Sequence, residues 1–263
     1  MERVALITDG SRGIGLAIAQ AFIKAGINVV IGARNARGLE EAAATLQRSI
    51  SDGLPPTRVD HVVADVKDQS AVDAMVDRVL ALHDRLDILV NNAGRGGSGP
   101  TAAADPSLWY EVIDTNLHGV YRVTRAALLR GGMVERKWGR IINVASMGGK
   151  VGIPFAAAYS ASKHGVLGFT KALALELAKT GVTVNAICPG FVDTDLSRDA
   201  MDRHGKLLGV SAEEALKRFM AHVPLSRYIQ PEEVAPLAVY LASDLAAPII
   251  GQAFNICGGI GSY

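Results

Sequence analysis

The first 26 residues constrain the fold more than any other part of this chain. Residues 4–8 are a short apolar run typical of a β-strand, glycines follow at positions 10, 13 and 15, and residues 16–24 have the apolar spacing of a helix that ends at Gly26. Glycines let the backbone turn sharply near a phosphate, and a helix N-terminus exposes N–H groups that attract one. A second apolar run, 28–32, follows at the distance expected of a βαβ unit. The segment predicts dinucleotide binding; the alternative is a purely structural turn.

Strand-like and helix-like segments alternate along the rest of the chain. We expect strands at 4–8, 28–32, 59–64, 88–91, 140–145, 183–187 and 253–256, with helical stretches between them that include 107–130 and 159–179. Such alternation favours parallel strands with helices on both faces. The expected fold is therefore α/β, with residues 1–263 forming a single-domain Rossmann-like doubly wound parallel sheet of about seven strands.

Charge and composition argue against several classes of protein. The formal net charge is +1 and there is no basic block, which argues against nucleic acid as a partner. No apolar run is long enough to span a bilayer, and the first strand leaves no room for a signal peptide, so we expect a cytoplasmic protein. Cys188 and Cys257 lie in apolar stretches and are expected to be buried thiols. The six histidines have no metal-ligand spacing, so no metal is expected.

A second informative pattern is Tyr159 and Lys163, four residues apart in a run with helical spacing. Residues at that spacing share a helix face, so the ammonium would lie beside the phenol. A nearby cation lowers the pKa of a tyrosine from about 10, towards the range useful for acid–base chemistry. Ser146 ends the apolar run RIINVAS, where a strand would deliver a hydroxyl to a site. Most such pairs, taken by themselves, are solvated surface.

These segments resemble the short-chain dehydrogenase/reductase family, and they occur in family order over nearly the whole chain. The matching pieces are TDGSRGIG, ADV at 64–66, NNAG at 91–94, Asn116 in DTNLHGV, Ser146, the Tyr159–Lys163 pair, and Pro189 with Gly190. Within the family the chain is most similar to the aromatic polyketide ketoreductases of the actinorhodin type, in stretches such as GGMVERKWGRIINVASMGGK and NICGGIGSY. The bacterial 3-oxoacyl-carrier-protein reductases are the next nearest relatives.

The resemblance implies a catalytic set of Asn116, Ser146, Tyr159 and Lys163. Tyr159 would be the general acid, and Ser146 would polarise the substrate carbonyl. Lys163 would lower the pKa of the tyrosine and hold the nicotinamide ribose. Asn116 would help to position the lysine and a proton-relay water, or it could be a helix-interior asparagine that satisfies a backbone group.

The residue after the second expected strand indicates which cofactor binds. Enzymes that bind NAD commonly place Asp or Glu there, whereas this chain has Ala33 followed by Arg34, with Arg12 in the glycine-rich turn. Two guanidiniums without a carboxylate favour the 2′-phosphate of NADPH, although Arg34 could be a surface arginine and Asp65 a helix cap. The expected cofactor-binding residues are Asp9, Gly10, Ser11, Arg12, Gly13, Ile14, Gly15, Arg34, Asp65, Val66, Asn92, Ala93, Gly94, Tyr159, Lys163, Pro189, Gly190, Val192 and Thr194.

Asp9 departs from the family pattern, in which the threonine of the turn is followed by glycine. Aspartate is among the few residues that visit the left-handed region, so the turn need not collapse. A carboxylate near the 2′-phosphate should nevertheless repel NADPH, unless it turns to solvent or pairs with Arg12 or Arg34.

Two further stretches should shape a substrate pocket. Residues 193–211 are long and of mixed polarity, and are expected to form a lid or, alternatively, an irregular surface excursion. The other stretch, GRGGSGP, has Gly96, Gly97 and Ser98 where the actinorhodin-type enzymes carry Pro-Gly-Gly, which leaves stereochemistry open. Arg95 could receive an acidic carrier protein, as in the family, or be an ordinary exposed arginine.

The expected function is an NADPH-dependent ketoreductase that reduces a ketone of a polyketide or β-ketoacyl thioester chain by hydride transfer. The expected partners are a free or tethered ketone, an acyl carrier protein as a candidate, and further copies of the chain in a homotetramer. The alternatives are a fatty-acid 3-oxoacyl-carrier-protein reductase, a small-molecule alcohol dehydrogenase, or a cofactor-binding regulator without turnover.

Overall fold

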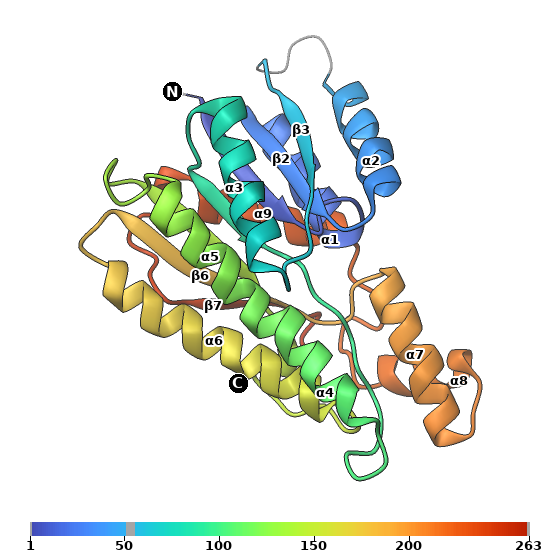
Figure 1. Cartoon of the computed structure of the whole chain (residues 1–263). Helices are drawn as coiled ribbons and strands as arrows, with labels where there is room; N and C mark the ends of the chain where they lie inside the picture. The colour runs from blue at the N-terminus through green and yellow to red at the C-terminus, as the bar shows by residue number, and fades with distance from the viewer. Residues whose placement is uncertain (1, 51–55, 262–263) are drawn as a thin grey trace.

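The computed structural model describes residues 2–50 and 56–261, and a parallel sheet lies at its centre (Figure 1). The sheet has seven strands in the order β3-β2-β1-β4-β5-β6-β7, and all its pairs are parallel. The strands are β1 (Arg3–Thr8), β2 (Ile27–Ala33), β3 (Val59–Val63), β4 (Ile88–Asn91), β5 (Gly139–Val144), β6 (Val182–Pro189) and β7 (Ala253–Ile256). The predicted doubly wound sheet is confirmed, and each strand overlaps its expected range.

Helices cover both faces of the sheet (Figure 1). One face packs against α1 (Gly13–Lys24), α2 (Ala36–Arg48) and α9 (Pro231–Ala242). The other packs against α3 (Gln69–His83), α5 (Gly119–Arg130) and α6 (Ala157–Leu177), with α4 (Pro106–Ile113) continuing that layer. A connection between two parallel strands must pass over one face of the sheet. The alternation of strands and helices in the sequence therefore places helices on both faces.

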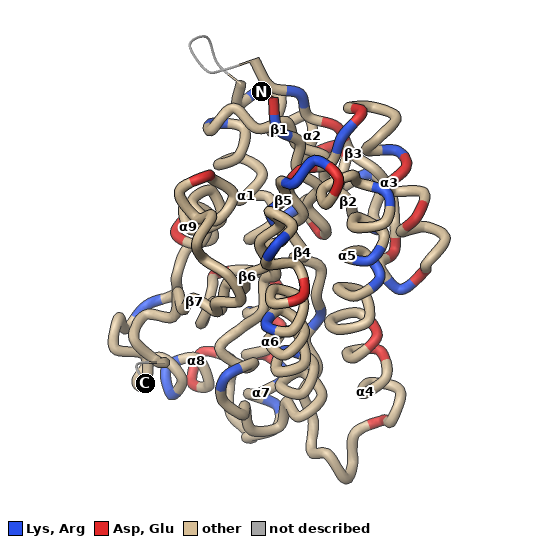
Figure 2. Tube along the Cα trace, turned by 90° about the vertical axis from the view of Figure 1, so that its left-hand side faces the viewer, with Lys and Arg blue, Asp and Glu red and all other residues tan. Residues whose placement is uncertain are grey.

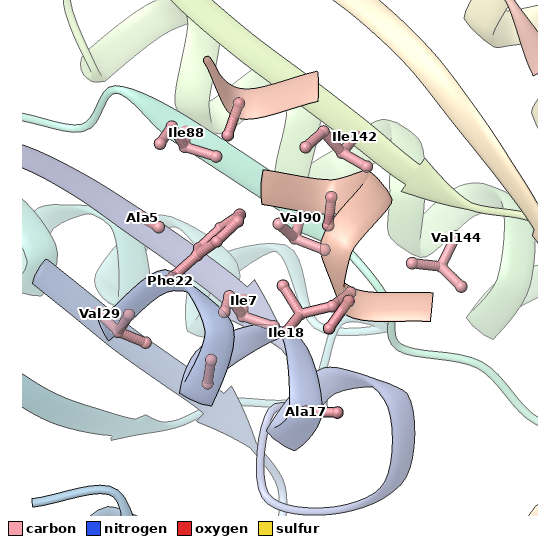
Figure 3. Packing of buried hydrophobic residues seen from close by; sticks show 14 of the residues in the cluster. Ala5, Ile7, Ala17, Ile18, Phe22, Val29, Ile88, Val90, Ile142 and Val144 are labelled. Carbon is pink, nitrogen blue, oxygen red and sulfur yellow. The ribbon is translucent and has the colours of Figure 1, made fainter. Parts of the chain in front are cut away.

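The strand sequences are apolar on both faces, as expected of a sheet that is covered twice. Successive strand residues point to opposite faces, so Ala5 and Ile7 of β1 belong to one core cluster and Val4 and Leu6 to the other. In the first cluster, Ile7 packs with Phe22 of α1, and both are fully buried (Figure 3). These contacts fix α1, and hence the turn that precedes it, against the end of β1.

The segment expected to be one helix over 107–130 has a wider turn at its centre. Between α4 and α5, residues Asp114–His118 form a π-helix that contains Asn116. The Asp105 carboxylate caps α4 by accepting a hydrogen bond from the Ser107 N–H, with Pro106 in the first turn. Single-turn π segments inside helices occur frequently at functional sites.

Residues 193–211 are largely helical and lie at one end of the molecule. Thr194 caps α7 (Asp195–Leu208), which ends at Gly209 with φ of 67°. After it, Ser211 caps α8 (Ala212–Met220), and the two helices lie side by side beyond the sheet (Figure 1). An aromatic contact also connects the two helices, because the His204 ring of α7 packs edge to face on the Phe219 ring of α8.

Acidic and basic residues are intermixed along the trace, without a block of one sign (Figure 2). Within residues 2–50 and 56–261, no helix is both long and apolar enough to cross a membrane. Over the same ranges no group of His, Cys, Asp and Glu side chains could hold a metal ion. Cys188 and Cys257 are free and buried, as the sequence predicts.

Candidate active site

A cavity of about 680 Å³ lies at the carboxyl ends of the strands. Ligands of open α/β sheets bind at this edge. Most of the predicted site residues line the cavity: Asp9, Arg12, Gly13, Ile14, Arg34, Asp65, Val66, Asn92, Ala93, Gly94, Ser146, Tyr159, Lys163, Pro189, Gly190, Val192 and Thr194. Gly10, Ser11, Gly15 and Asn116 are not part of its lining.

The glycine-rich turn has residues that only glycine suits. Gly13 begins α1 with φ of 52°, and a Cβ built there would lie 3.1 Å from the Thr194 methyl group. A Cβ built on Gly15 would lie 2.5 Å from the Asp9 carbonyl oxygen. Gly15 therefore acts from behind the turn, by letting α1 approach it, rather than from the cavity wall.

Hydrogen bonds tie the NNAG turn after β4 to the glycine-rich turn. The Asn92 side-chain amide donates to the carbonyl oxygens of Thr8 (3.1 Å) and Asp9 (3.0 Å). The Thr8 hydroxyl accepts from the backbone N–H groups of Asn92 and Ala93, both at 3.0 Å. Thr8 was not among the predicted site residues, although its place at the end of the first strand was a signal.

Ser146, Tyr159 and Lys163 meet at the end of β5. The Ser146 hydroxyl accepts a hydrogen bond from the Gly148 N–H at 3.0 Å. Lys163 is 5% exposed, and its ammonium donates to the Val144 carbonyl oxygen at 2.9 Å. All three line the same cavity, so a strand end and one face of α6 together form a hydroxyl–phenol–ammonium group.

The pKa values of this group differ from the prediction. Burial raises the pKa of Tyr159, which a hydrogen bond from Ser146 only partly offsets. Burial also lowers the pKa of Lys163 to about 8. The expectation that Lys163 lowers the pKa of the tyrosine is therefore wrong for this structure, because the phenol is desolvated and the ammonium is directed to Val144.

The amide of Asn116 holds the backbone of the segment after β4. Its carbonyl accepts from the Arg95 N–H at 2.8 Å, and its NH₂ group donates to the Arg95 carbonyl (3.0 Å) and to the Ser162 hydroxyl (3.1 Å). Asn116 is fully buried. A Cβ built on neighbouring Gly94 would lie 3.5 Å from the Asn116 carbonyl oxygen and 3.7 Å from the Lys163 nitrogen. Asn116 thus satisfies backbone groups and also fixes the turn beside the lysine.

The far end of the cavity carries Arg34, which is exposed after the last residue of β2. Arg12 forms an ion pair with Asp195 of α7 at 3.2 Å. Asp9 has φ of 49°, so the expected left-handed conformation is found. Its burial raises the pKa of its carboxyl, and the charges of Arg12 and Arg34 oppose that rise. Asp9 is thus half-buried rather than turned fully to solvent, and the ion pair of Arg12 is with Asp195 rather than with Asp9.

Asp65 does not cap a helix. Its carboxylate accepts from the Lys67 N–H at 2.9 Å, which closes a small turn at the cavity wall. The cap of α3 is Asp68, which accepts from the N–H groups of Ser70 and Ala71. Asp65 therefore lies free of the helix and lines the cavity, and it follows the strand that pairs with the strand preceding Arg34.

The predicted site residues do not include the six residues of α7 that line the cavity: Asp195, Leu196, Ser197, Arg198, Asp199 and Arg203. Only the position of α7 brings them to the cavity, so their spacing became informative once the helix was known. Arg95 pairs with Glu111 of α4. Its charge is thus partly neutralised by the chain itself.

A parallel sheet with a glycine-rich turn after β1 and a Ser–Tyr–Lys group after β5 defines a Rossmann-type oxidoreductase. The family model described as short chain dehydrogenase matches residues 3–205. A protein of Streptomyces coelicolor that is described as a ketoacyl reductase is 48% identical to this chain over 262 residues. The match covers 100% of this chain and 98% of that protein. The 3-oxoacyl-acyl-carrier-protein reductase of Synechocystis is 41% identical over 259 residues, covering 98% of this chain and 96% of that protein.

Two solved structures of reductases have the same fold as this chain. A single-substitution variant of actinorhodin polyketide ketoreductase with NADPH superposes with a TM-score of 0.94 at 47% identity, covering 100% of this chain and 98% of that one. Levodione reductase superposes with a TM-score of 0.92 at 32% identity, covering 99% and 98%. The chain therefore belongs to the short chain dehydrogenase family. It is an oxidoreductase that acts on CH–OH or C=O groups and uses a nicotinamide cofactor.

Proposed function

We propose that this protein is an NADPH-dependent ketoreductase that reduces a ketone of a polyketide or β-ketoacyl thioester chain. One observation carries the proposal. A single cavity has the glycine-rich turn and Arg34 at one end, and Ser146, Tyr159 and Lys163 at the other. A nicotinamide cofactor that spanned this length would bring its reactive ring to the hydroxyl–phenol pair.

The residues of the chain fit NADPH. Gly13 places no side chain at the cavity wall, Gly15 lets α1 approach the turn from behind, and no carboxylate follows Ala33 at the end of β2. Arg34, exposed at the cavity, is the natural ligand of a 2′-phosphate. The other contacts would come from the residues predicted above and found along the cavity, including Asn92, Gly94 and Thr194. When bound, the cofactor supplies the hydride.

The chain supplies the proton and the placement of the ketone. Because burial raises the pKa of Tyr159, its phenol is protonated at neutral pH and suits the role of general acid in a reduction. The Ser146 hydroxyl would donate to the carbonyl oxygen as negative charge develops there. Lys163 would bind the nicotinamide ribose, and Asn116 would position Lys163 through the Gly94 turn.

The substrate class rests on the relatives and on the position of α7 beside the cavity. The relatives described above are a ketoacyl reductase and a 3-oxoacyl-acyl-carrier-protein reductase, and one of the two solved structures reported above is a polyketide ketoreductase. Residues 193–211, largely α7, would act as a lid over the substrate. An acyl carrier protein remains a candidate partner, although Arg95 is paired with Glu111 and offers it less charge.

Oxidation of NADPH with a panel of β-ketoacyl thioesters, cyclic ketones and sugars tests the proposal. Turnover of the thioesters or the cyclic ketones supports it. Turnover of a saturated 3-oxoacyl-carrier-protein, with no turnover of the other thioesters or the cyclic ketones, would support a fatty-acid reductase, and turnover of sugars alone would support a small-molecule dehydrogenase. NADPH binding without turnover of any substrate would favour the regulator.

We also propose a cytoplasmic homotetramer. The helices α4–α5 and α6 offer long faces for two-fold contacts, and Leu175 of α6 is 76% exposed in the single chain. Closed dihedral symmetry suits such faces. A monomeric mass by light scattering at micromolar concentration would rule the tetramer out.

A further inference from the structure

Arg203 of α7 is a charged side chain of the cavity wall whose role the site described so far does not explain. Its Nε atom is buried and has no hydrogen-bond partner among the described residues. The residue lines the cavity. A buried donor without a partner costs free energy, and in native structures such a group needs an explanation.

The position of Arg203 places it at the substrate end of the cavity. The start of α7 lines the cavity through the consecutive residues 195–199, and Arg203, four residues after Asp199, continues that lining along the helix. The first turn of this helix lies beside Gly13, whereas Arg203 lies two turns further along. That distance carries it from the glycine-rich turn towards the segment that follows Gly94.

Gly96 makes room for this side chain. A Cβ built on Gly96 would lie 3.0 Å from the Nη2 atom of Arg203 and 3.3 Å from the Leu196 side chain. The same segment begins at Gly94, beside the Lys163 nitrogen. The guanidinium therefore lies beside the stretch of backbone that begins at the turn next to the Lys163 nitrogen.

We infer that Arg203 is a substrate-binding residue, which takes the oxygens of a β-dicarbonyl unit next to the ketone that is reduced. This inference rests on the proposed ketoreductase function and names its substrate more closely: a chain with at least one carbonyl beyond the β-ketoacyl unit.

The chemistry of the two groups matches. A guanidinium presents a planar fork of N–H donors. A 1,3-dicarbonyl, above all as its enolate, presents two oxygens in one plane on one side. Pairing them gives two charge-assisted hydrogen bonds, which are stronger than neutral ones and demand a planar partner. A chain with one ketone and its thioester offers no such second pair, so it would leave Arg203 without a partner.

The test compares two N-acetylcysteamine thioesters of equal chain length, 3-oxohexanoyl and 3,5-dioxohexanoyl. Reduction of the second at C5 leaves its C1 and C3 carbonyls as the pair for Arg203, whereas the first has no pair besides the ketone that is reduced. Steady-state NADPH oxidation gives kcat/KM for each, and inhibition by a 2,4-pentanedione probe gives a binding readout without turnover. The variants are Arg203→Met and Arg203→Lys. The matched control is Arg218→Met, because Arg218 is an exposed arginine of α8 that pairs with Glu214, outside the cavity.

In Arg203→Met, kcat/KM for the dioxo thioester should fall about tenfold or more, as for the loss of a hydrogen bond to a charged group. The value for the mono-oxo thioester should stay within about twofold, as should both values in the control. Arg203→Lys should recover only part of the loss, since it keeps the charge without the fork. The pentanedione should inhibit Arg203→Met more weakly than the wild type.

Equal losses for both thioesters would mean that Arg203 only supports α7, and no loss for either would mean that it faces solvent; each overturns the inference. Both results leave the proposed function intact, provided that the wild type turns over a ketone. A wild type that reduces neither thioester and no cyclic ketone would instead refute the proposed function.

Discussion

The Lys163 ammonium lies over the ring of Tyr159, with 5.9 Å between its nitrogen and the ring centroid. The two residues are four apart on α6, so the helix itself sets this distance. The ammonium nevertheless donates its hydrogen bond to Val144 rather than to the phenol. In the structure, the pair is thus a buried neutral phenol beside an ammonium whose charge is also disfavoured by burial.

Tyr159→Phe should remove most of the ketone reduction while leaving NADPH binding nearly unchanged. The substitution deletes the proton donor but keeps the ring that packs beside Gly148. Loss of a general acid lowers kcat by about 10²- to 10⁴-fold. Steady-state kinetics and a cofactor titration measure the two effects. Turnover within about threefold of the wild type would exclude the tyrosine from the mechanism.

Arg34→Ala should weaken NADPH far more than NADH, because only NADPH carries the 2′-phosphate. Loss of a charge-assisted hydrogen bond should raise the Kd for NADPH about tenfold or more, with that for NADH within about twofold. Fluorescence titration with each cofactor is the measurement. Arg37→Ala is the control, since Arg37 is exposed on α2 and pairs with Glu41. An equal loss for both cofactors would show that Arg34 is not a phosphate ligand.

The lowered pKa of Lys163 predicts how stability depends on pH. Its pKa falls from 10.5 to about 8 on folding, so between these values the unfolded chain binds more protons than the folded one. Stability should therefore rise with pH in that window, and the rise should be absent in Lys163→Met. From about pH 7.5 to about pH 9.5, the wild type should gain about 2 kcal/mol relative to the variant.

Urea unfolding of the cofactor-free proteins, at one protein concentration, measures this difference. Lys171→Met is a matched control, because Lys171 is exposed on the same helix. It should change with pH as the wild type does. Parallel pH profiles for the wild type and Lys163→Met would mean that the folded state does not lower the pKa of the buried lysine.

The sheet could be predicted because each strand is an apolar run that both helix layers bury. In β4, for example, Ile88 and Val90 face one cluster and Leu89 the other, so the run carries the burial of both faces. The carboxyl ends of these apolar runs lie at the edge of the sheet where ligands bind, so they indicate the site. Thr8, Asn92 and Ser146 all follow from this rule, without any knowledge of side-chain contacts.

Three features could not be predicted from the sequence, because each depends on packing between distant segments. The direction of the Tyr159 pKa follows from burial, which a four-residue spacing does not reveal. The pairing of Arg12 with Asp195 joins residues 183 positions apart. Arg203 became a site residue only when α7 was placed against Gly96.

Asp9→Gly should fold normally and bind NADPH more tightly than the wild type. Asp9 has φ of 49°, a conformation that glycine adopts without strain, so the turn should keep its shape. Burial makes the Asp9 carboxylate costly, and only the charges of Arg12 and Arg34 offset this. Arg34 is also the proposed ligand of the 2′-phosphate, so the carboxylate competes with the phosphate for the same cation.

Titration with NADPH at low and at high salt tests this competition. The gain in affinity should shrink as salt rises, because screening weakens charge repulsion. Asp9→Asn is the matched control: it tolerates the left-handed backbone and removes only the charge, so it should show most of the same gain. Weaker NADPH binding in both variants would instead make the carboxylate a productive ligand, most simply of a ribose hydroxyl. A gain in Asp9→Gly alone would assign the effect to the backbone rather than to the charge.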